Sequence, residues 1–235
     1  MPIKDNSESS KSSYLSDFVY GGIDGSVTTF AVVAGVAGAS LSPSIVLILG
    51  FANLFADGFS MAVGNYLGTK SKKEYIEKIR KAEEISVHSI PDEEREEIRE
   101  IFKEKGFFGR QLEEAVKIIT NNKEIWIDTM MKDEFGILEE QKSPLRGALV
   151  TFTAFNLIGF IPLFAYVLSH LFRSLEDHTF LLSVLLTSCA FFIVGSVKGK
   201  IVNKKWCLSG LETLLIGGVA AAIAFLAGFF LKNLA

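Results

Sequence analysis

Two aspartates interrupt apolar segments that otherwise carry no charge. Asp24 follows Gly21, Gly22 and Ile23, and Asp57 lies in the middle of the next apolar run. A carboxylate in the hydrocarbon of a bilayer costs about 2.5–3.5 kcal/mol on insertion scales, and it marks an ion pathway or a proton relay. The alternative for both residues is a neutral carboxyl group that joins two helices by hydrogen bonds.

The same two segments carry further ligand-type side chains at helical spacing. Four of them recur every four residues along the second segment: Asn53, Asp57, Met61 and Asn65. Asp17 precedes Asp24 by seven residues, so each set lies on one face of a helix. Oxygen and thioether ligands together suit a divalent transition metal better than Mg²⁺ or Ca²⁺, which gain nothing from sulfur. Met61 alone is weak evidence, because methionine usually fills apolar cores.

A second group of acids occupies a charged stretch from Ser71 to Lys142, which holds 19 of the 27 acidic and 14 of the 24 basic residues. The ligand-type residues here are Glu83, Glu84, Glu93, Glu94, Glu96, Glu97, Glu100, Glu104, Met130, Met131 and Glu134. Glu134 follows the two methionines by three and four residues, which places the three side chains on one helix face. Carboxylates without lysines on the same face favour a bound cation. The alternative is a solvated, charge-patterned surface.

Five apolar segments are long enough to cross a bilayer, which takes about 20 residues. They cover residues 18–39, 44–68, 147–169, 179–197 and 211–231. Their length and the absence of breaks favour helices over strands. The expected fold is therefore all-α: a polytopic membrane protein with five transmembrane helices and a helical, metal-binding domain inserted between the second and third.

This organisation divides the chain into four parts. They are a flexible Ser-rich tail over 1–16, the first two membrane helices over 17–69, the acidic domain over 70–142 and the last three membrane helices over 143–235. In the acidic domain, residues 70–88 are expected to form a first helix, Pro91 to start the next, and Gly106 and Gly136 to end helices. The tail has no apolar stretch of the kind found in a cleavable signal peptide.

Lysine and arginine predict the orientation in the membrane. The link 40–43 between the first two spans carries no base, whereas the link 198–205 between the last two carries four lysines. We therefore expect the N-terminus and the acidic domain in the cytosol and the C-terminus outside.

Composition excludes several other classes of protein. Clustered charge argues against one soluble globular domain, and Cys189 and Cys207 lie too far apart in sequence to indicate a disulfide or zinc motif. The net charge of −3 gives no reason to expect a nucleic-acid partner. No HExxH or GxSxG motif is present, so the chain is not expected to be an enzyme.

Two runs resemble signatures of the vacuolar iron transporter family. Residues 21–30 read GGIDGSVTTF and resemble the first-helix signature, and residues 56–67 read ADGFSMAVGNYL and resemble the second-helix signature. The likeness extends over about 16–231, with the acidic insert in the family's position. It implies a homodimer in a cell membrane or a vacuole-type membrane, exporting Fe²⁺ from the cytosol, with Mn²⁺ or Zn²⁺ as other candidate ions and no tightly bound cofactor. Vacuolar members exchange the metal for protons, along a pathway between the first and second helices at the dimer interface.

Carried over by position, the resemblance implies functional residues. In the membrane it implies Asp17 at the cytosolic mouth and Asp24 and Met61 as pathway ligands. In the insert it implies metal binding by Glu83, Glu94, Glu97, Met130, Met131 and Glu134.

The chain departs from the family pattern at three positions. Asn53 stands where transporting members usually carry a membrane glutamate, and Ser86 stands where another glutamate of the insert is expected. Asp57 replaces a small residue one turn from Asn53. An amide cannot carry a proton, so proton exchange would have to depend on Asp57. The serine predicts fewer or weaker metal sites in the insert.

Two rival functions compete with metal transport. An intramembrane aspartyl protease also places two carboxylates on neighbouring spans, but the Gly-Ile-Asp and Ala-Asp-Gly contexts of this chain match neither of its motifs. A membrane sensor or scaffold whose insert buffers metal would share the acidic domain without moving ions. Flux into vesicles distinguishes the transporter from the sensor, and peptide cleavage tests for the protease.

Overall fold

The computed structural model describes residues 6–137 and 142–234, and every regular element in these ranges is helical. The α-helices are α1 (Asn6–Gly38), α2 (Pro43–Ser89), α3 (Pro91–Glu104), α4 (Gly109–Thr120), α5 (Lys123–Asp133), α6 (Pro144–Leu171), α7 (Thr179–Ile201) and α8 (Trp206–Leu231). Two short 3₁₀ helices, η1 (Arg173–His178) and η2 (Lys232–Leu234), follow α6 and α8. Five of the helices, α1, α2, α6, α7 and α8, are long and apolar enough to cross a membrane, which confirms the five expected spans.

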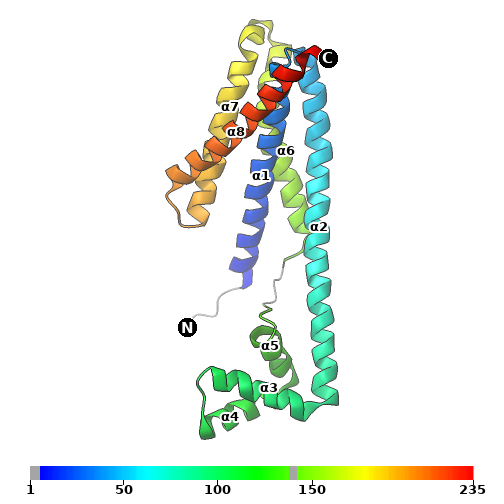
Figure 1. Cartoon of the computed structure of the whole chain (residues 1–235), viewed down its shortest axis with the longest axis vertical. Coiled ribbons are helices and arrows are strands. Elements are labelled where there is room, and N and C mark those ends of the chain that lie inside the picture. The colour runs from blue at the N-terminus through cyan, green and yellow to red at the C-terminus, as the bar shows by residue number, and fades with distance from the viewer. Residues whose placement is uncertain (1–5, 138–141, 235) are drawn as a thin grey trace. The chain divides into compact units, whose positions relative to one another are not determined.

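The chain divides into two compact units, a membrane unit of residues 1–67 and 142–235 and an insert unit of residues 68–141. In the membrane unit, α1 packs closely against α6, α7 and α8, and α7 lies beside α8 (Figure 1). Its apolar core contains Phe30, Val33 and Val46 from the first two helices with Leu163 and Phe191 from α6 and α7.

Glycines allow α1 to approach its neighbours closely. A Cβ atom on Gly21 would lie 2.6 Å from the carbonyl oxygen of Thr151, and one on Gly25 would collide with the carbonyl oxygen of Phe155. Near its other end, Gly38 lies equally close to the backbone of α8 at Phe225. Small residues are the usual means of close helix packing in lipid. The glycines that flank Asp24 therefore hold α1 against α6 and leave Asp24 half-buried beside that contact.

Two expectations about helix boundaries need correction. Residues 6–16 were expected to form a flexible tail, but they are the first turns of α1; residues 1–5 lie outside the described residues. Residues 70–88 were expected to form a separate helix of the insert, but they continue α2, a single helix of 47 residues. In both cases a polar segment prolongs a helix that already exists, and each added residue gains a hydrogen bond without a new nucleation step.

The insert unit folds around its own apolar core. Eight buried side chains form this core: Val87, Ile98, Leu112, Val116, Trp126, Ile127, Met130 and Met131. Pro91 is the first residue of α3, as expected, and Gly106 and Gly136 follow α3 and α5 with φ of +92° and +64°. Such left-handed positions after a helix favour glycine, which has no Cβ to clash with the following carbonyl.

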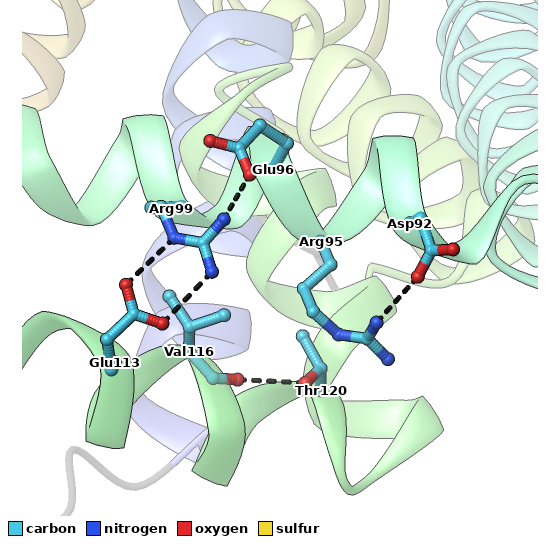
Figure 2. Close-up of polar contacts among 7 residues, drawn as sticks. All are labelled: Asp92, Arg95, Glu96, Arg99, Glu113, Val116 and Thr120. Carbon is cyan, nitrogen blue, oxygen red and sulfur yellow. Dashed lines mark hydrogen bonds and ion pairs between the residues drawn. The ribbon is translucent and has the colours of Figure 1, made fainter.

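One ion pair joins the polar faces of α3 and α4, and two more lie within α3 (Figure 2). The Arg99 guanidinium donates through Nε and Nη2 to the two carboxylate oxygens of Glu113, at 3.1 Å and 3.0 Å, and it also contacts Glu96. Arg95 pairs with Asp92 on the same helix. A two-point contact between a guanidinium and a carboxylate fixes direction as well as distance, so it helps to set how α4 lies on α3.

Candidate functional site

Polar side chains of α1 face those of α2 at several levels of the membrane unit. The amide of Asn53 donates to the hydroxyl of Thr28 at 3.5 Å, and the amide of Asn65 donates to Asp17 Oδ1 at 3.0 Å. Between these two levels, the carboxylates of Asp24 and Asp57 lie close enough to repel each other electrostatically. The structure thus brings the aspartates of α1 to the face of α2 that carries Asn53, Asp57 and Asn65.

Asp17 is the most enclosed of these acids, with 8% of its surface exposed. Its Oδ1 atom accepts hydrogen bonds from Asn65 and from Lys142 Nζ, the latter at 2.8 Å. Asn65 also donates to Thr151 Oγ1 of α6 at 2.7 Å, so α1, α2 and α6 meet at this level. Asp24, Asp57 and Met61 remain half-buried.

Three carboxylates of the insert, those of Glu94, Glu97 and Glu134, carry charges that act on a fourth, Glu83. Burial and the neighbouring charges of the other three raise the pKa of Glu83 to about 7. Burial and the charges of Glu97 and Glu93 raise the pKa of Glu94, and burial with the charges of Glu97 and Glu94 raises the pKa of Glu134. Glu83 and Glu94 are only 7% and 5% exposed, and in each the Oε2 atom is buried without a hydrogen-bond partner.

Other acids of the insert are neutralised by arginine or lysine. Ion pairs with a basic side chain engage Glu74, Glu84, Asp92, Glu96, Glu113, Glu114, Asp128 and Asp133. In the described ranges, no ion pair involves any of the four clustered carboxylates. The charge-patterned surface and the unneutralised cluster therefore coexist on different parts of the insert.

The remaining predicted ligands of the insert have distinct surroundings. Met130 and Met131 belong to the apolar core, with 0% and 5% exposed. Ser86, at the position where a glutamate is expected, hydrogen-bonds Glu94 and so supports the charged form of that carboxylate. Over residues 6–137 and 142–234, no three His, Cys, Asp or Glu side chains converge tightly enough to hold a metal ion in this conformation. The insert holds neighbouring acids, and a bound ion would have to draw them together.

Residues 15–229 match the family model of the VIT family. The chain belongs to the VIT family. Three relatives show how far the likeness extends, each 32–35% identical. The vacuolar iron transporter of Toxoplasma gondii is 35% identical over 97% of this chain and 78% of its own length. The vacuolar iron transporter of Plasmodium falciparum is 32% identical over 93% and 82%, and vacuolar iron transporter 1 of Arabidopsis thaliana is 35% identical over 89% and 82%.

Sequence reasoning missed two residues of this candidate site. Lys142 is separated from Asp17 by 125 positions, and nothing in the local pattern singles it out among the lysines of the acidic stretch. Thr28 lies four residues after Asp24 and could have been found from that spacing, which places it on the same helix face.

The raised pKa of Glu83 predicts a pH-dependent stability for the insert. The folded unit keeps this proton up to a pH of about 7, whereas the unfolded chain loses it near 4.5. Stability therefore falls as pH rises through this window, and the loss is complete above it. In metal-free buffer, Glu83→Gln should raise the melting temperature of the insert by a few degrees at pH 8 and leave it unchanged at pH 4.

Trp126 lies in the insert core and reports its unfolding by fluorescence in a Trp206→Phe background. Glu77→Gln, at an exposed position of α2, is the matched control and should change neither melting temperature. An equal effect of Glu83→Gln at both pH values would contradict the idea that the buried charge of Glu83 causes the loss of stability at high pH.

Proposed function

We propose that this VIT-family membrane protein transports Fe²⁺ across the bilayer. The observation that carries the proposal is the family match over residues 15–229, together with relatives that are named vacuolar iron transporters. Membership of a family of transporters agrees with the expectation that the chain is not an enzyme. The ionisable side chains inside the membrane unit provide the chemistry that such a function needs.

The proposed pathway runs along the face shared by α1 and α2. Asp17 receives the ion at the cytosolic mouth, and Asp24 and Met61 bind it within the membrane. The charge of Asp57 acts on the carboxylate of Asp24. One turn from Asp57 on α2, the amide of Asn53 donates a hydrogen bond to the Thr28 hydroxyl. A site that combines oxygen ligands with a thioether sulfur suits Fe²⁺ or Mn²⁺ better than Mg²⁺ or Ca²⁺.

The active form is proposed to be a homodimer. Asp24, Asp57 and Met61 are half-buried within a single chain, although acids inside a membrane normally face protein or a water-filled cavity. The opposite face of α2 presents the exposed side chains Phe55 and Phe59. A second copy that covers the half-buried acids would take them out of contact with lipid.

The insert is proposed to collect metal in the cytosol for export to the outside. Its cluster of Glu83, Glu94, Glu97 and Glu134 has no basic partner among the described residues, so a divalent cation would relieve its mutual repulsion. Two buried carboxylate oxygens without a hydrogen bond support the same idea. The methionines of α5 lie in the apolar core, so their participation would require that core to open.

Flux into proteoliposomes tests the proposed function. Purified protein should carry Fe²⁺ into vesicles under anaerobic conditions, and a pH gradient across the same vesicles reports whether protons move in exchange. Mn²⁺ and Zn²⁺ can be compared in the same assay. Metal binding without flux would identify the protein as a membrane metal sensor or buffer instead.

Removing charge from the insert should weaken metal capture without stopping transport. Simultaneous replacement of Glu94, Glu97 and Glu134 by Gln is expected to weaken Fe²⁺ binding about tenfold, within the range seen when a metal site loses supporting groups. Calorimetry on the full chain in an Asp24→Asn background isolates this binding, and flux in the otherwise native chain should fall without being abolished.

A matched control replaces three acids that already pair with arginine. The variant Asp92→Asn with Glu96→Gln and Glu113→Gln removes the same charge from the ion-paired face. It should leave Fe²⁺ affinity unchanged. Equal weakening by both triple variants would show that the insert attracts metal only through its net charge.

A further inference from the structure

Lys142 forms the most enclosed ion pair of the membrane unit among the described residues. Its Nζ atom lies 2.8 Å from Asp17 Oδ1, and the two side chains are only 14% and 11% exposed. Asn65 donates to the same oxygen at 3.0 Å, while Asp17 Oδ2 is buried without a hydrogen-bond partner. The pair thus uses one carboxylate oxygen and leaves the other enclosed and unsatisfied.

The absence of a side chain at Gly147 leaves room for the ion pair between Asp17 and Lys142. A Cβ atom on Gly147 would lie 3.0 Å from both Asp17 Oδ2 and Lys142 Cε, so a larger residue there would crowd the pair. Lys142 itself precedes α6 and lies outside any helix. The next residue, Ser143, is held in place because its backbone N–H donates to the Tyr14 hydroxyl at 3.0 Å. Only the lysine side chain, and not the start of α6, would have to move to free Asp17.

We propose that Lys142 is a tethered counter-ion that holds the entrance carboxylate Asp17 until a divalent cation displaces it. The proposal rests on the proposed transport of Fe²⁺ through an entrance at Asp17. Lys142 is then a specificity-determining residue of the entrance, because every incoming ion must compete with its ammonium group for the same oxygen.

Charge decides which ions can compete. At equal distance a divalent ion is attracted to the carboxylate twice as strongly as a singly charged ammonium, and low local polarity enlarges that difference. A monovalent ion carries no charge advantage and must also give up its water, while the lysine is already in place. The unsatisfied Oδ2 atom gives an incoming divalent ion a second oxygen that the ammonium does not use. The pair would therefore exclude Na⁺ and K⁺ while admitting Fe²⁺.

Amine labelling tests the displacement directly. Detergent-purified protein is treated briefly with acetic anhydride, with and without anaerobic Fe²⁺, and acetylation of Lys142 is measured by mass spectrometry. Fe²⁺ should increase Lys142 acetylation several-fold, whereas Na⁺ at matched ionic strength should not, and Lys200 on the exposed end of α7 should respond to neither. Asp17→Asn should make Lys142 reactive without metal. Unchanged labelling with Fe²⁺, or an equal response to Na⁺, would overturn the proposal.

Variants test the consequence for transport. Lys142→Met removes the competing charge, so the Fe²⁺ concentration that half-saturates flux should fall about tenfold. Lys142→Arg keeps a cation and should stay close to wild type, and in an Asp17→Asn background Lys142→Met should have no further effect. An unchanged or raised half-saturating concentration in Lys142→Met would show that the pair is only structural. Labelling does not depend on flux, so a protein that fails to transport can still expose Lys142 on metal binding.

Discussion

Asp24→Asn is expected to abolish Fe²⁺ flux while the protein still inserts and assembles. The substitution keeps the size of the side chain and removes the charge that a cation needs at the centre of the membrane unit. Replacing a group that only supports a metal ligand already lowers metal affinity or activity by roughly 10–100-fold. Loss of a ligand itself should therefore lower flux by at least roughly 100-fold. Initial Fe²⁺ uptake into proteoliposomes, normalised to reconstituted protein, measures the effect.

A matched control separates this result from a general loss of structure. Asp177→Asn makes the same chemical change at an exposed position in η1, and it should leave flux unchanged. The elution volume of the Asp24→Asn variant in size-exclusion chromatography should equal that of the wild type. Near-normal flux in well-assembled Asp24→Asn would mean that this aspartate serves only to join helices.

Asp57→Asn is expected to make transport insensitive to pH. Exchange of metal for protons needs a group that carries either one, and a carboxylate does so where an amide such as Asn53 cannot. Asp57 lies one turn from Asn53 on α2, and its charge acts on the carboxylate of Asp24 on α1, on the other side of the proposed pathway. Metal bound at Asp24 would therefore favour release of a proton from Asp57, and protonation of Asp57 would weaken the metal site.

Restoring a carboxylate next to Asp57 provides the sharper test. In the Asp57→Asn background, Asn53→Glu should partly restore the pH dependence, because it places a titratable group back on the same face of α2. Fe²⁺ flux is measured at several external pH values for the wild type, both single variants and the double variant. A wild type without any pH dependence would identify a facilitator, and Asp57 would then be a carboxyl group that packs helices.

These two experiments and the labelling of Lys142 address successive levels of the proposed pathway. Asp17 and Lys142 concern entry, Asp24 concerns binding within the membrane, and Asp57 concerns coupling. Variants at different levels should affect different quantities: the half-saturating concentration for Lys142, the maximal flux for Asp24 and the pH dependence for Asp57. A single shared defect in all three would indicate a general effect on folding instead.

Local sequence was sufficient to predict the features that depend on neighbouring residues. In the described part of the chain, hydropathy identified the five helices that are long and apolar enough to cross a membrane, since a span must satisfy its backbone hydrogen bonds within the helix and present apolar side chains to lipid. Pro91, Gly106 and Gly136 marked helix ends for equally local reasons of backbone geometry. The boundary of the helix at 70–88 was wrong, because no proline or glycine pattern tells a continuing helix from a new one at a change of polarity.

Only the tertiary structure decided which of these residues meet. The pairing of Asp17 with Lys142, and the mutual influence of Glu83, Glu94 and Glu134, join positions far apart in the chain. The burial of Met130 in the insert core likewise depends on which face of α5 packs inward. Helical spacing tells which side chains share a face, but the packing of other helices determines what that face contacts. For that reason the sequence alone indicated the metal-binding chemistry, whereas the ion pair between Lys142 and Asp17 became visible only in the fold.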